Sequence, residues 1–305
     1  MYISPKTIDM LSNGLGSQSM FLMLMAGRGV IPATVSTTAD TGAENDCLWS
    51  TGERSSAAEY FERVVHPYGI KNGIDTRLVR AVDIDKKPLL PLMEQVAKAI
   101  AEKGRPESIP LYGSRGGQQL QSCTDKWKIR AIRQEARRMG ATKLITAQGI
   151  HFAESGRRSK GYIIGKHGEW TLYQDTYTRR VFEMIDGKKI CVEKVEVPVK
   201  WCNHYYPLVD LRYGRQTAQD ELSKEGIPYL VTSQCDFCPH NDLDRWMRHT
   251  PQVLVQIAEM EATMGGKFFF TPERVPLMEA LAIKAAKPKL TVEAGFGCGN
   301  SYCGV

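Results

Sequence analysis

Long hydrophobic runs are scarce in this sequence of 305 residues. The longest covers residues 20–26, about a third of the roughly 20 apolar residues that a membrane-spanning helix needs. The start of the chain has neither the basic region nor the small-residue cleavage site of a signal peptide. Internal repeats and low-complexity tracts are also missing, which excludes repeat arrays. We therefore expect a cytoplasmic protein with no membrane partner.

Cysteine is too sparse for a disulfide-stabilised scaffold, since only eight cysteines are spread over the chain. The remaining composition, 42% hydrophobic and 24% charged, is that of a globular chain with one large core, or one core plus a smaller appendage. A net charge of +6 favours anionic partners such as nucleotides, sulfate esters or nucleic acid. Arg130, Arg133 and Arg137 share one side of an expected helix, as in a solvated or an anion-binding face.

Hydrophobic periodicity predicts alternating strands and helices in the first half of the chain. The expected strands are 7–11, 33–38, 76–82 and 143–147, and the expected helices are 17–25, 53–65, 89–103 and 124–138. This order predicts an α/β fold, in which a Rossmann-like, mostly parallel sheet is covered by helices on both faces.

The second half of the chain has a different pattern. Residues 161–199 alternate β-branched and aromatic residues, with turn signals at 166–168 and 186–187, which predicts an inserted antiparallel hairpin. Helices are expected at 217–225 and within 242–286, in a helical, cysteine-containing C-terminal region. We expect three parts: an α/β core over residues 1–160, a β insert over 161–200, and the rest of the core with the C-terminal region over 201–305.

A loop rich in glycine and serine joins the first expected strand to the first expected helix. Consecutive backbone N–H groups and the positive end of a helix dipole bind phosphate at such a place, and serine hydroxyls add donors. Polar turns follow two further strands, at the same edge of a parallel sheet. Taken alone, each stretch also fits a plain turn. The residues predicted to bind a nucleotide cofactor are Ser12, Asn13, Gly14, Gly16, Ser17, Asp40, Gly42 and Gly149.

The segment after the fourth expected strand places charged groups at that same edge. Glu154 supplies a carboxylate and Arg158 a guanidinium, and a guanidinium suits bidentate contact with phosphate or sulfate. A local salt bridge or a helix cap is the alternative for these two residues. His151 fits a hydrogen-bonded loop residue better than a catalyst.

The cysteine pairs are the strongest chemical signal. Cys235 and Cys238 have the two-residue spacing that lets two thiolates reach one metal ion, and Cys298 and Cys303 form a second pair. Cys123 is a fifth candidate, because it begins an expected helix, whose dipole lowers a thiol pKa. Four sulfurs can hold a structural zinc or an iron–sulfur cluster; a redox pair and buried packing are the alternatives for Cys235 and Cys238. The isolated cysteines predicted to be ordinary packing residues are Cys47, Cys191 and Cys202.

Six motifs occur in an order that resembles a known family. They are Ser12-Asn13-Gly14-Leu15-Gly16-Ser17, Ala39-Asp40-Thr41-Gly42-Ala43-Glu44, Cys123 with Lys128, residues 149–158, Tyr206-Pro207-Leu208, and residues 235–239. In this order they resemble the phosphoadenosine phosphosulfate (PAPS) reductase family of the adenine nucleotide α-hydrolase, or PP-loop ATP pyrophosphatase, superfamily. The chain looks most similar to phage-borne and DNA-phosphorothioation-associated members. The resemblance covers residues 7–239 apart from the expected hairpin.

The resemblance implies how a nucleotide is bound. It implies a PP-loop at residues 12–17 around the phosphates of ATP or a PAPS-like adenine nucleotide, with Asp40 and Gly42 near the adenosine. It also implies that Glu154 and Arg158 correspond to the family's Glu-Ser-x-x-Arg segment. Magnesium is a further candidate cofactor beside the nucleotide.

The resemblance also bears on metals and partners. In iron–sulfur members an early cysteine and a late Cys-x-x-Cys pair hold the cluster, which matches Cys123, Cys235 and Cys238 here. Zinc is the alternative occupant. Nucleic acid and a sulfur-donor or thioredoxin-like protein are the candidate macromolecular partners, together with a second copy of the chain in a homo-oligomer.

Three departures from the family pattern affect the expected chemistry. The usual PP-loop, Ser-Gly-Gly-x-Asp-Ser, has a glycine in place of Asn13 and an aspartate in place of Gly16. These exchanges leave phosphate binding by the backbone in place. They argue against metal-assisted release of pyrophosphate. His151 stands where the family has an arginine, so we expect this chain to differ from the family in the anion that it recognises. Reductases end in a Glu-Cys-Gly motif, whereas Cys298 and Cys303 have no adjacent glutamate.

These observations support three functions. The first is an ATP-pyrophosphatase-type enzyme that activates an acceptor by adenylation for sulfur transfer or nucleic-acid modification, with the cysteines as sulfur carrier or scaffold. The second is a thiol-dependent reductase of PAPS or its unphosphorylated analogue, in which Cys298 or Cys303 attacks sulfur. The third is a non-catalytic nucleotide- or nucleic-acid-binding module. The predicted catalytic residues are Glu154, Arg158, Cys298 and Cys303.

Overall fold

The computed structural model describes residues 6–157, 162–231 and 234–286. The chain forms two compact units, each assembled from three separate segments. We call them the sheet unit, with Met1–Thr38, Val64–Arg77 and Arg133–Tyr229, and the helical unit, with Ala39–Arg63, Leu78–Ile132 and Leu230–Val305. The three parts expected from the sequence follow chain order, whereas these units interleave along the chain.

Seven strands form one sheet, which lies in the sheet unit apart from the last residues of two strands. They are β1 (Thr7–Ser12), β2 (Val35–Ala39), β5 (Asp75–Val79), β7 (Lys143–Gln148), β8 (Ile163–His167), β9 (Trp170–Ile185) and β10 (Lys188–Tyr205). Their order is β5-β2-β1-β7-β10-β9-β8. The pairs β1–β2, β1–β7 and β7–β10 are parallel, and β10–β9 and β9–β8 are antiparallel. The predicted α/β fold with a mostly parallel sheet is confirmed.

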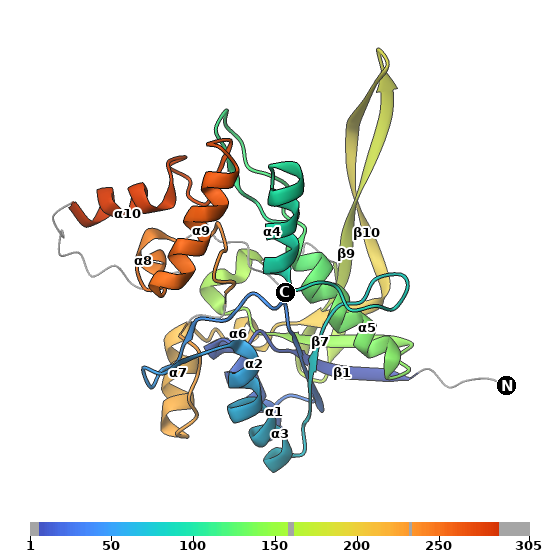
Figure 1. Ribbon diagram of the computed structural model, residues 1–305. Helices are drawn as coiled ribbons and strands as arrows, with labels where there is room; N and C mark the ends of the chain where they lie inside the picture. Colours follow the sequence, from blue (N-terminus) through green and yellow to red (C-terminus); the bar gives the residue numbers. More distant parts are fainter. Residues whose placement is uncertain (1–5, 158–161, 232–233, 287–305) are drawn as a thin grey trace. The chain divides into compact units, whose positions relative to one another are not determined.

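Helices cover both faces of this sheet. Those of the sheet unit are α1 (Ser17–Gly27), α3 (His66–Asn72), the 3-10 helix η3 (Phe152–Arg157), α6 (Pro207–Asp210) and α7 (Arg215–Lys224). A further helix, α5 (Arg130–Arg138), continues the π-helix η2 (Thr124–Ile129) and enters this unit at Arg133. Figure 1 shows α1, α3 and α7 on one side of β1 and β7 and α5 on the other.

The burial of α1 follows from its sequence. Every residue from Met20 to Met25 is buried, as is expected of a helix that is apolar around its whole circumference. This run is too short to cross a membrane, and within the described ranges no helix is both long enough and apolar enough to do so.

The helical unit has its own core. Its elements are β3 (Cys47–Leu48), β4 (Arg54–Ser55), α2 (Ala57–Tyr60), the π-helix η1 (Phe61–Val65), α4 (Leu92–Lys103), β6 (Tyr112–Gly113), α8 (Leu243–Trp246), α9 (Pro251–Thr263), β11 (Phe268–Phe269) and α10 (Leu277–Ala286). The core joins Val96 of α4, Trp127 of η2, Trp246 of α8 and Ile257 of α9. Phe237, from the Cys-x-x-Cys segment, is also part of it and is fully buried.

The strands β9 and β10 are 16 and 18 residues long and pair beyond the sheet as a two-stranded ribbon, which we define as residues 176–198. The turn that joins them has positive φ at Asp186 (50°) and Gly187 (73°), as a type I′ turn requires. The predicted antiparallel hairpin is thus present. At its base, Cys202 to Tyr205 pair in parallel with β7, so the hairpin extends the main sheet.

Candidate functional site

The strand order creates a switch point between β1 and β7. From β1 the sheet continues through β2 to β5 in one direction, and from β7 through β10 in the other. In open α/β sheets, ligands bind outside the carboxyl ends of the strands at such a point. The loop 12–17, after β1, and the segment that begins at Gly149, after β7, both lie at this place in the sheet unit.

Asn13 holds the loop 12–17 in shape. Its Oδ1 accepts a hydrogen bond from the N–H of Leu15 at 2.8 Å, and its Nδ2 donates to Ser36 Oγ at 3.2 Å. Its own N–H donates to the carbonyl of Thr37 at 2.9 Å. Asn13 is buried, so an asparagine at this position supplies loop contacts that a glycine cannot make.

Leu15 adopts a backbone conformation that few residues tolerate. Its φ is 64°, in the left-handed region, and its side chain is buried. Non-glycine residues held in this region store about 1–3 kcal/mol of strain, which is common where a loop wraps around a ligand. The strain is offset by the buried leucine side chain and by the hydrogen bond to Asn13.

The start of α1 is suited to an anion. Gly16 is the N-cap residue, and no side chain of the described residues caps the helix. Among the same residues, the buried hydroxyls of Ser12 and Thr37 have no hydrogen-bond partner. Ser12 pairs with Thr37 on β2 and with Gln148 on β7, so the three side chains lie on one face of the sheet. Backbone and hydroxyl donors therefore gather at the end of β1.

Gly149 packs directly against the first turn of α1. A Cβ atom at this position would lie 3.0 Å from the N and Oγ atoms of Ser19 and 3.2 Å from the carbonyl carbon of Gln18. Only glycine lets the two backbone segments approach this closely. The predicted role of Gly149 in nucleotide binding stays a prediction, but the residue does adjoin Gln18 and Ser19, which directly follow the loop 12–17.

The segment after Gly149 forms a local ion pair. His151 Nε2 lies 3.1 Å from Glu154 Oε2, and both side chains are largely buried. For Glu154, a local salt bridge was the alternative to an anion-binding role, and this contact with His151 is of that kind. Arg158, the other predicted member of this segment, lies outside the described residues.

Asp40 and Gly42 belong to the helical unit and shape a turn there. Asp40 Oδ1 accepts from the N–H of Gly42 at 2.8 Å, and Oδ2 pairs with Arg80 at 2.6 Å. Gly42 has a φ of 63°, and a Cβ atom there would lie 2.5 Å from Cβ of Pro91. The predicted contacts of Asp40 and Gly42 with adenosine stay predictions.

The Cys-x-x-Cys segment is fixed within the helical unit by its neighbours. Asp236 accepts from the N–H groups of Asn45 at 2.7 Å and Asp46 at 3.3 Å. Burial raises the pKa of Asp236 to about 7, despite those two hydrogen bonds. Gln234 Nε2 donates to Cys238 Sγ at 3.6 Å. Both ends of the segment are therefore held in place.

Other motif residues converge on the same part of the helical unit. Lys128 Nζ lies 3.0 Å from Glu44 Oε1, although 84 residues separate them. Cys123 and Cys235 both pack against the hydrophobic cluster that contains Phe237. The structure thus brings together three of the motifs named above. The predicted metal ligands Cys298 and Cys303, which are also predicted catalytic residues, lie outside the described residues.

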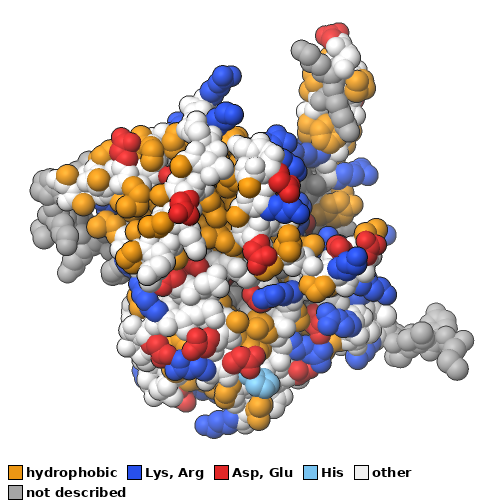
Figure 2. Space-filling model, in the orientation of Figure 1, with side chains coloured by type: hydrophobic (Ala, Val, Ile, Leu, Met, Phe, Trp, Pro, Cys, Tyr) orange, Lys and Arg blue, Asp and Glu red, His pale blue; other side chains and the backbone are white. Residues whose placement is uncertain are grey.

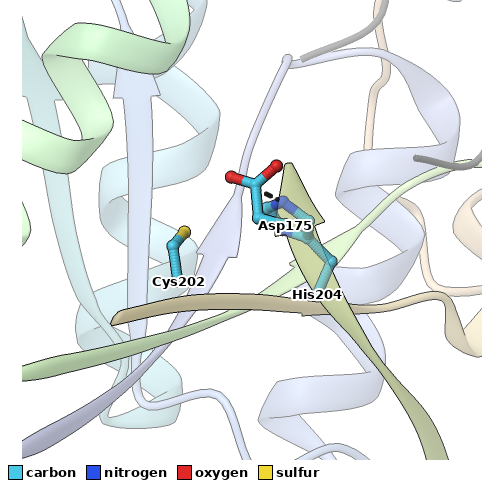
Figure 3. A group of neighbouring side chains, drawn as sticks. All are labelled: Asp175, Cys202 and His204. Carbon is cyan, nitrogen blue, oxygen red and sulfur yellow. Dashed lines mark ion pairs between the residues drawn. The ribbon is translucent and has the colours of Figure 1, made fainter. Parts of the chain in front are cut away.

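A different trio lies closest to metal-site geometry. Among the described residues, Asp175, Cys202 and His204 form the group of three candidate ligands whose ligand atoms lie within 4.8 Å of one another. All three are buried in the sheet unit. Figure 3 shows the ion pair between Asp175 and His204, at 3.1 Å, with Cys202 beside it. Carboxylate, thiol and imidazole are all ligand types of zinc.

Arg133 already supplies a positive charge to this trio. Its guanidinium forms an ion pair with Asp175 and a hydrogen bond with Cys202. Burial opposes ionisation of Asp175, but the hydrogen bond and charge of His204 and the charge of Arg133 lower its pKa to about 2. Burial and the charge of Asp175 raise the pKa of Cys202 to about 12. A metal ion fits here only if Arg133 leaves, so we interpret the group as a buried ion network.

This network reaches the carboxyl edge of the sheet through Gln148. His204 Nδ1 contacts Thr146 Oγ1 and lies 2.9 Å from Gln148 Nε2. Gln148 in turn is the register partner of Ser12. Asp175 and His204 belong to no recognisable motif and were not predicted, whereas Gln148 directly precedes Gly149 but was assigned no role of its own.

The three isolated cysteines and the basic face of α5 differ in part from what the sequence predicts. Cys47 and Cys202 are buried, whereas Cys191 is exposed on the ribbon, so a packing role for Cys191 is wrong. The guanidinium of Arg137 stacks over the ring of Trp201, 3.8 Å from its centre, in a cation–π contact. Arg133 and Arg137 therefore contact the protein itself, and the expected solvated face is only partly present.

Comparisons with known proteins add little beyond this geometry. No family model matches the chain, and no curated protein matches it. Among solved structures, the chain is similar to the crystal structure of phosphoadenylyl-sulfate (PAPS) reductase from Candida auris in complex with phosphate. The two share 8% sequence identity with a TM-score of 0.36, over 74% of this chain and 76% of that chain.

Proposed function

We propose that the protein binds an adenine nucleotide through its phosphates at the loop 12–17. One observation carries this proposal: the hydroxyl of Ser12 is buried without a partner among the described residues, beside the uncapped start of α1. A buried hydroxyl without a hydrogen bond is unfavourable, and a bound phosphate oxygen would supply the missing acceptor. The helix dipole would favour the same negative charge.

The reaction that best fits this arrangement is activation of an acceptor by an ATP pyrophosphatase-type enzyme, for sulfur transfer or nucleic-acid modification. In this proposal the N–H groups in the first turn of α1 and the hydroxyl of Ser12 hold the phosphates, because the N–H groups of Asn13, Gly14 and Leu15 already donate within the protein. Gln148, which contacts His204, is the register partner of Ser12 on the neighbouring strand, so the two side chains lie on the same face of the sheet. Pyrophosphate release that depends on ATP would support this reaction, whereas sulfite release would indicate a reductase. Binding without turnover would indicate a non-catalytic module.

Replacing Ser12 with alanine should weaken ATP binding. A hydrogen bond to a charged group contributes about 1.5–3 kcal/mol, which corresponds to a roughly ten- to hundredfold lower affinity. Isothermal titration calorimetry with ATP measures this change. The matched control is Ser223→Ala, which removes an exposed hydroxyl from α7 in the same unit. Equal affinities of the two variants would contradict a phosphate contact by Ser12.

We further propose that Cys235 and Cys238, with Cys123, hold zinc or an iron–sulfur cluster. The donor set is soft, since it consists of sulfur atoms, and Cys123 and Cys235 pack against one apolar cluster in the helical unit. The amide of Gln234, which donates to Cys238 Sγ, would stabilise a thiolate at that position. When bound, zinc would link the segment to the core, and a cluster would add electron or sulfur transfer.

Metal content tests this second proposal directly. Anaerobically purified protein should contain zinc, or iron with matching acid-labile sulfide, and Cys235→Ser should lose most of it because one ligand is gone. The control is Cys191→Ser, which changes an exposed cysteine on the ribbon. Metal-free wild-type protein, or metal retained by Cys235→Ser, would exclude these ligands.

A further inference from the structure

The ribbon of β9 and β10 projects from the sheet unit with both faces exposed. Its strands pair from Thr176 with Pro198 to Ile185 with Lys188, and among the described residues neither strand pairs with a third strand over this stretch. Figure 1 shows the ribbon as a narrow two-stranded arm. An isolated two-stranded hairpin is only marginally stable in water, so a partner that covers this arm would stabilise it.

The register places two cations opposite each other on one face. Arg180 on β9 is the partner of Lys194 on β10, and both side chains are exposed. No ion pair joins either cation to a carboxylate among the described residues of the ribbon. The nearest carboxylate on this face, that of Glu196, accepts a hydrogen bond from Thr176 at 3.1 Å. Like charges placed directly opposite destabilise a strand pair, unless an anion lies between them.

Exposed apolar side chains continue the same face toward the tip. Phe182 is 45% exposed and Met184 is 68% exposed. They follow Arg180 at every second position along β9, so all three side chains lie on the same face. Figure 2 shows hydrophobic and cationic side chains side by side on the projecting arm. The opposite face carries Arg179 together with Glu183 and Glu193, so it has no excess of positive charge.

We propose that this face of the ribbon binds double-stranded DNA. A two-stranded β-ribbon fits the major groove of B-DNA, and cations on it contact the phosphates. Arg180 and Lys194 would each neutralise a phosphate, and this contact would relieve their mutual repulsion. Phe182 and Met184 would supply apolar contacts to base edges such as the thymine methyl group. This inference concerns a second surface and does not depend on nucleotide binding at the loop 12–17.

Fluorescence anisotropy with a short labelled DNA duplex tests the proposal. The variant Arg180→Gln/Lys194→Gln should bind at least about tenfold more weakly, and the slope of log affinity against log salt should fall by about two. The matched control, Arg179→Gln, removes a cation from the neighbouring position on the other face and should change affinity less than about twofold. Duplex RNA should bind more weakly than DNA, because its major groove is too narrow for the ribbon.

Three results would overturn the proposal. The first is no DNA binding by the wild-type protein at low salt, and the second is an equal loss of affinity in Arg179→Gln. The third is a dimer, seen by sedimentation, that Arg180→Gln/Lys194→Gln dissociates, which would identify a second copy of the chain as the occupant. ATP titration and thermal melting of the same variants separate loss of DNA binding from failure of the loop 12–17 or of folding.

Discussion

Replacing Gly149 with valine is expected to weaken nucleotide binding about a hundredfold. The added Cβ would lie 3.0 Å from the backbone nitrogen of Ser19 and 3.2 Å from the carbonyl carbon of Gln18, and two methyl groups would extend beyond it. The first turn of α1 must then move, and a displacement of about 1 Å at a binding site can weaken its function roughly a hundredfold. Overpacking should also lower the free energy of unfolding by about 1–3 kcal/mol.

Calorimetry with ATP and chemical denaturation measure the two effects separately. Gly214→Val is the matched control, because a Cβ at Gly214 has no atom within 4 Å, its φ is −93° and it lies in the same unit outside residues 149–158. It should leave both quantities almost unchanged. A Gly149→Val protein that still binds ATP like the wild type would show that the start of α1 is not the phosphate site.

Replacing Arg133 with methionine is expected to be the most destabilising change in the buried ion network. Asp175 would keep His204 as a partner but lose the guanidinium, and its side chain is only 10% exposed. Removing one partner of a buried ion pair typically lowers the free energy of unfolding by about 3–5 kcal/mol. The matched control is Arg138→Met on the same helix, whose side chain is 64% exposed and pairs with the buried Glu135. Glu135 keeps Arg77 as a second partner at 2.6 Å, so losing the exposed Arg138 should cost only about 1 kcal/mol.

The pH dependence of stability gives the network a second signature. The pKa of Asp175 is lowered from its ordinary value of 3.8 to about 2 in the folded protein. The unfolded chain therefore binds the proton more readily, so the stabilisation is complete above the unfolded pKa and is lost as the pH falls through about 2. Denaturation curves should show Arg133→Met losing part of this acid dependence. A variant as stable as Arg138→Met, with unchanged acid dependence, would contradict a stabilising role for the network.

Local patterns were enough to predict the loop 12–17 and its flanks. The apolar strand that ends at Ser12, the glycines after it and the apolar helix that begins at Ser17 lie within a few residues of one another. The Asp186-Gly187 turn was predictable for the same reason, because turn chemistry depends on adjacent residues. The role of Asn13 was not, since its partners Ser36 and Thr37 lie on the next strand.

The buried ion network could not be predicted in this way. Arg133 and Asp175 are 42 residues apart, and they meet only because β9 joins the main sheet through β10. Cys191 was expected to pack and is exposed, because it lies on the ribbon, where among the described residues β9 and β10 pair only with each other. Burial on a strand depends on what covers its face, and the alternating pattern does not contain that information.

The sequence by itself determined the α/β class, the strand–loop–helix unit at residues 7–27 and the hairpin with its turn. These follow from hydrophobic period and turn residues, which act over a few positions. Only the tertiary structure decided the strand order, the approach of Gly149 to α1, the pairing of Glu44 with Lys128 and the charged network around Asp175. Those contacts join segments far apart in the chain, and their geometry depends on which strands pair and in which register.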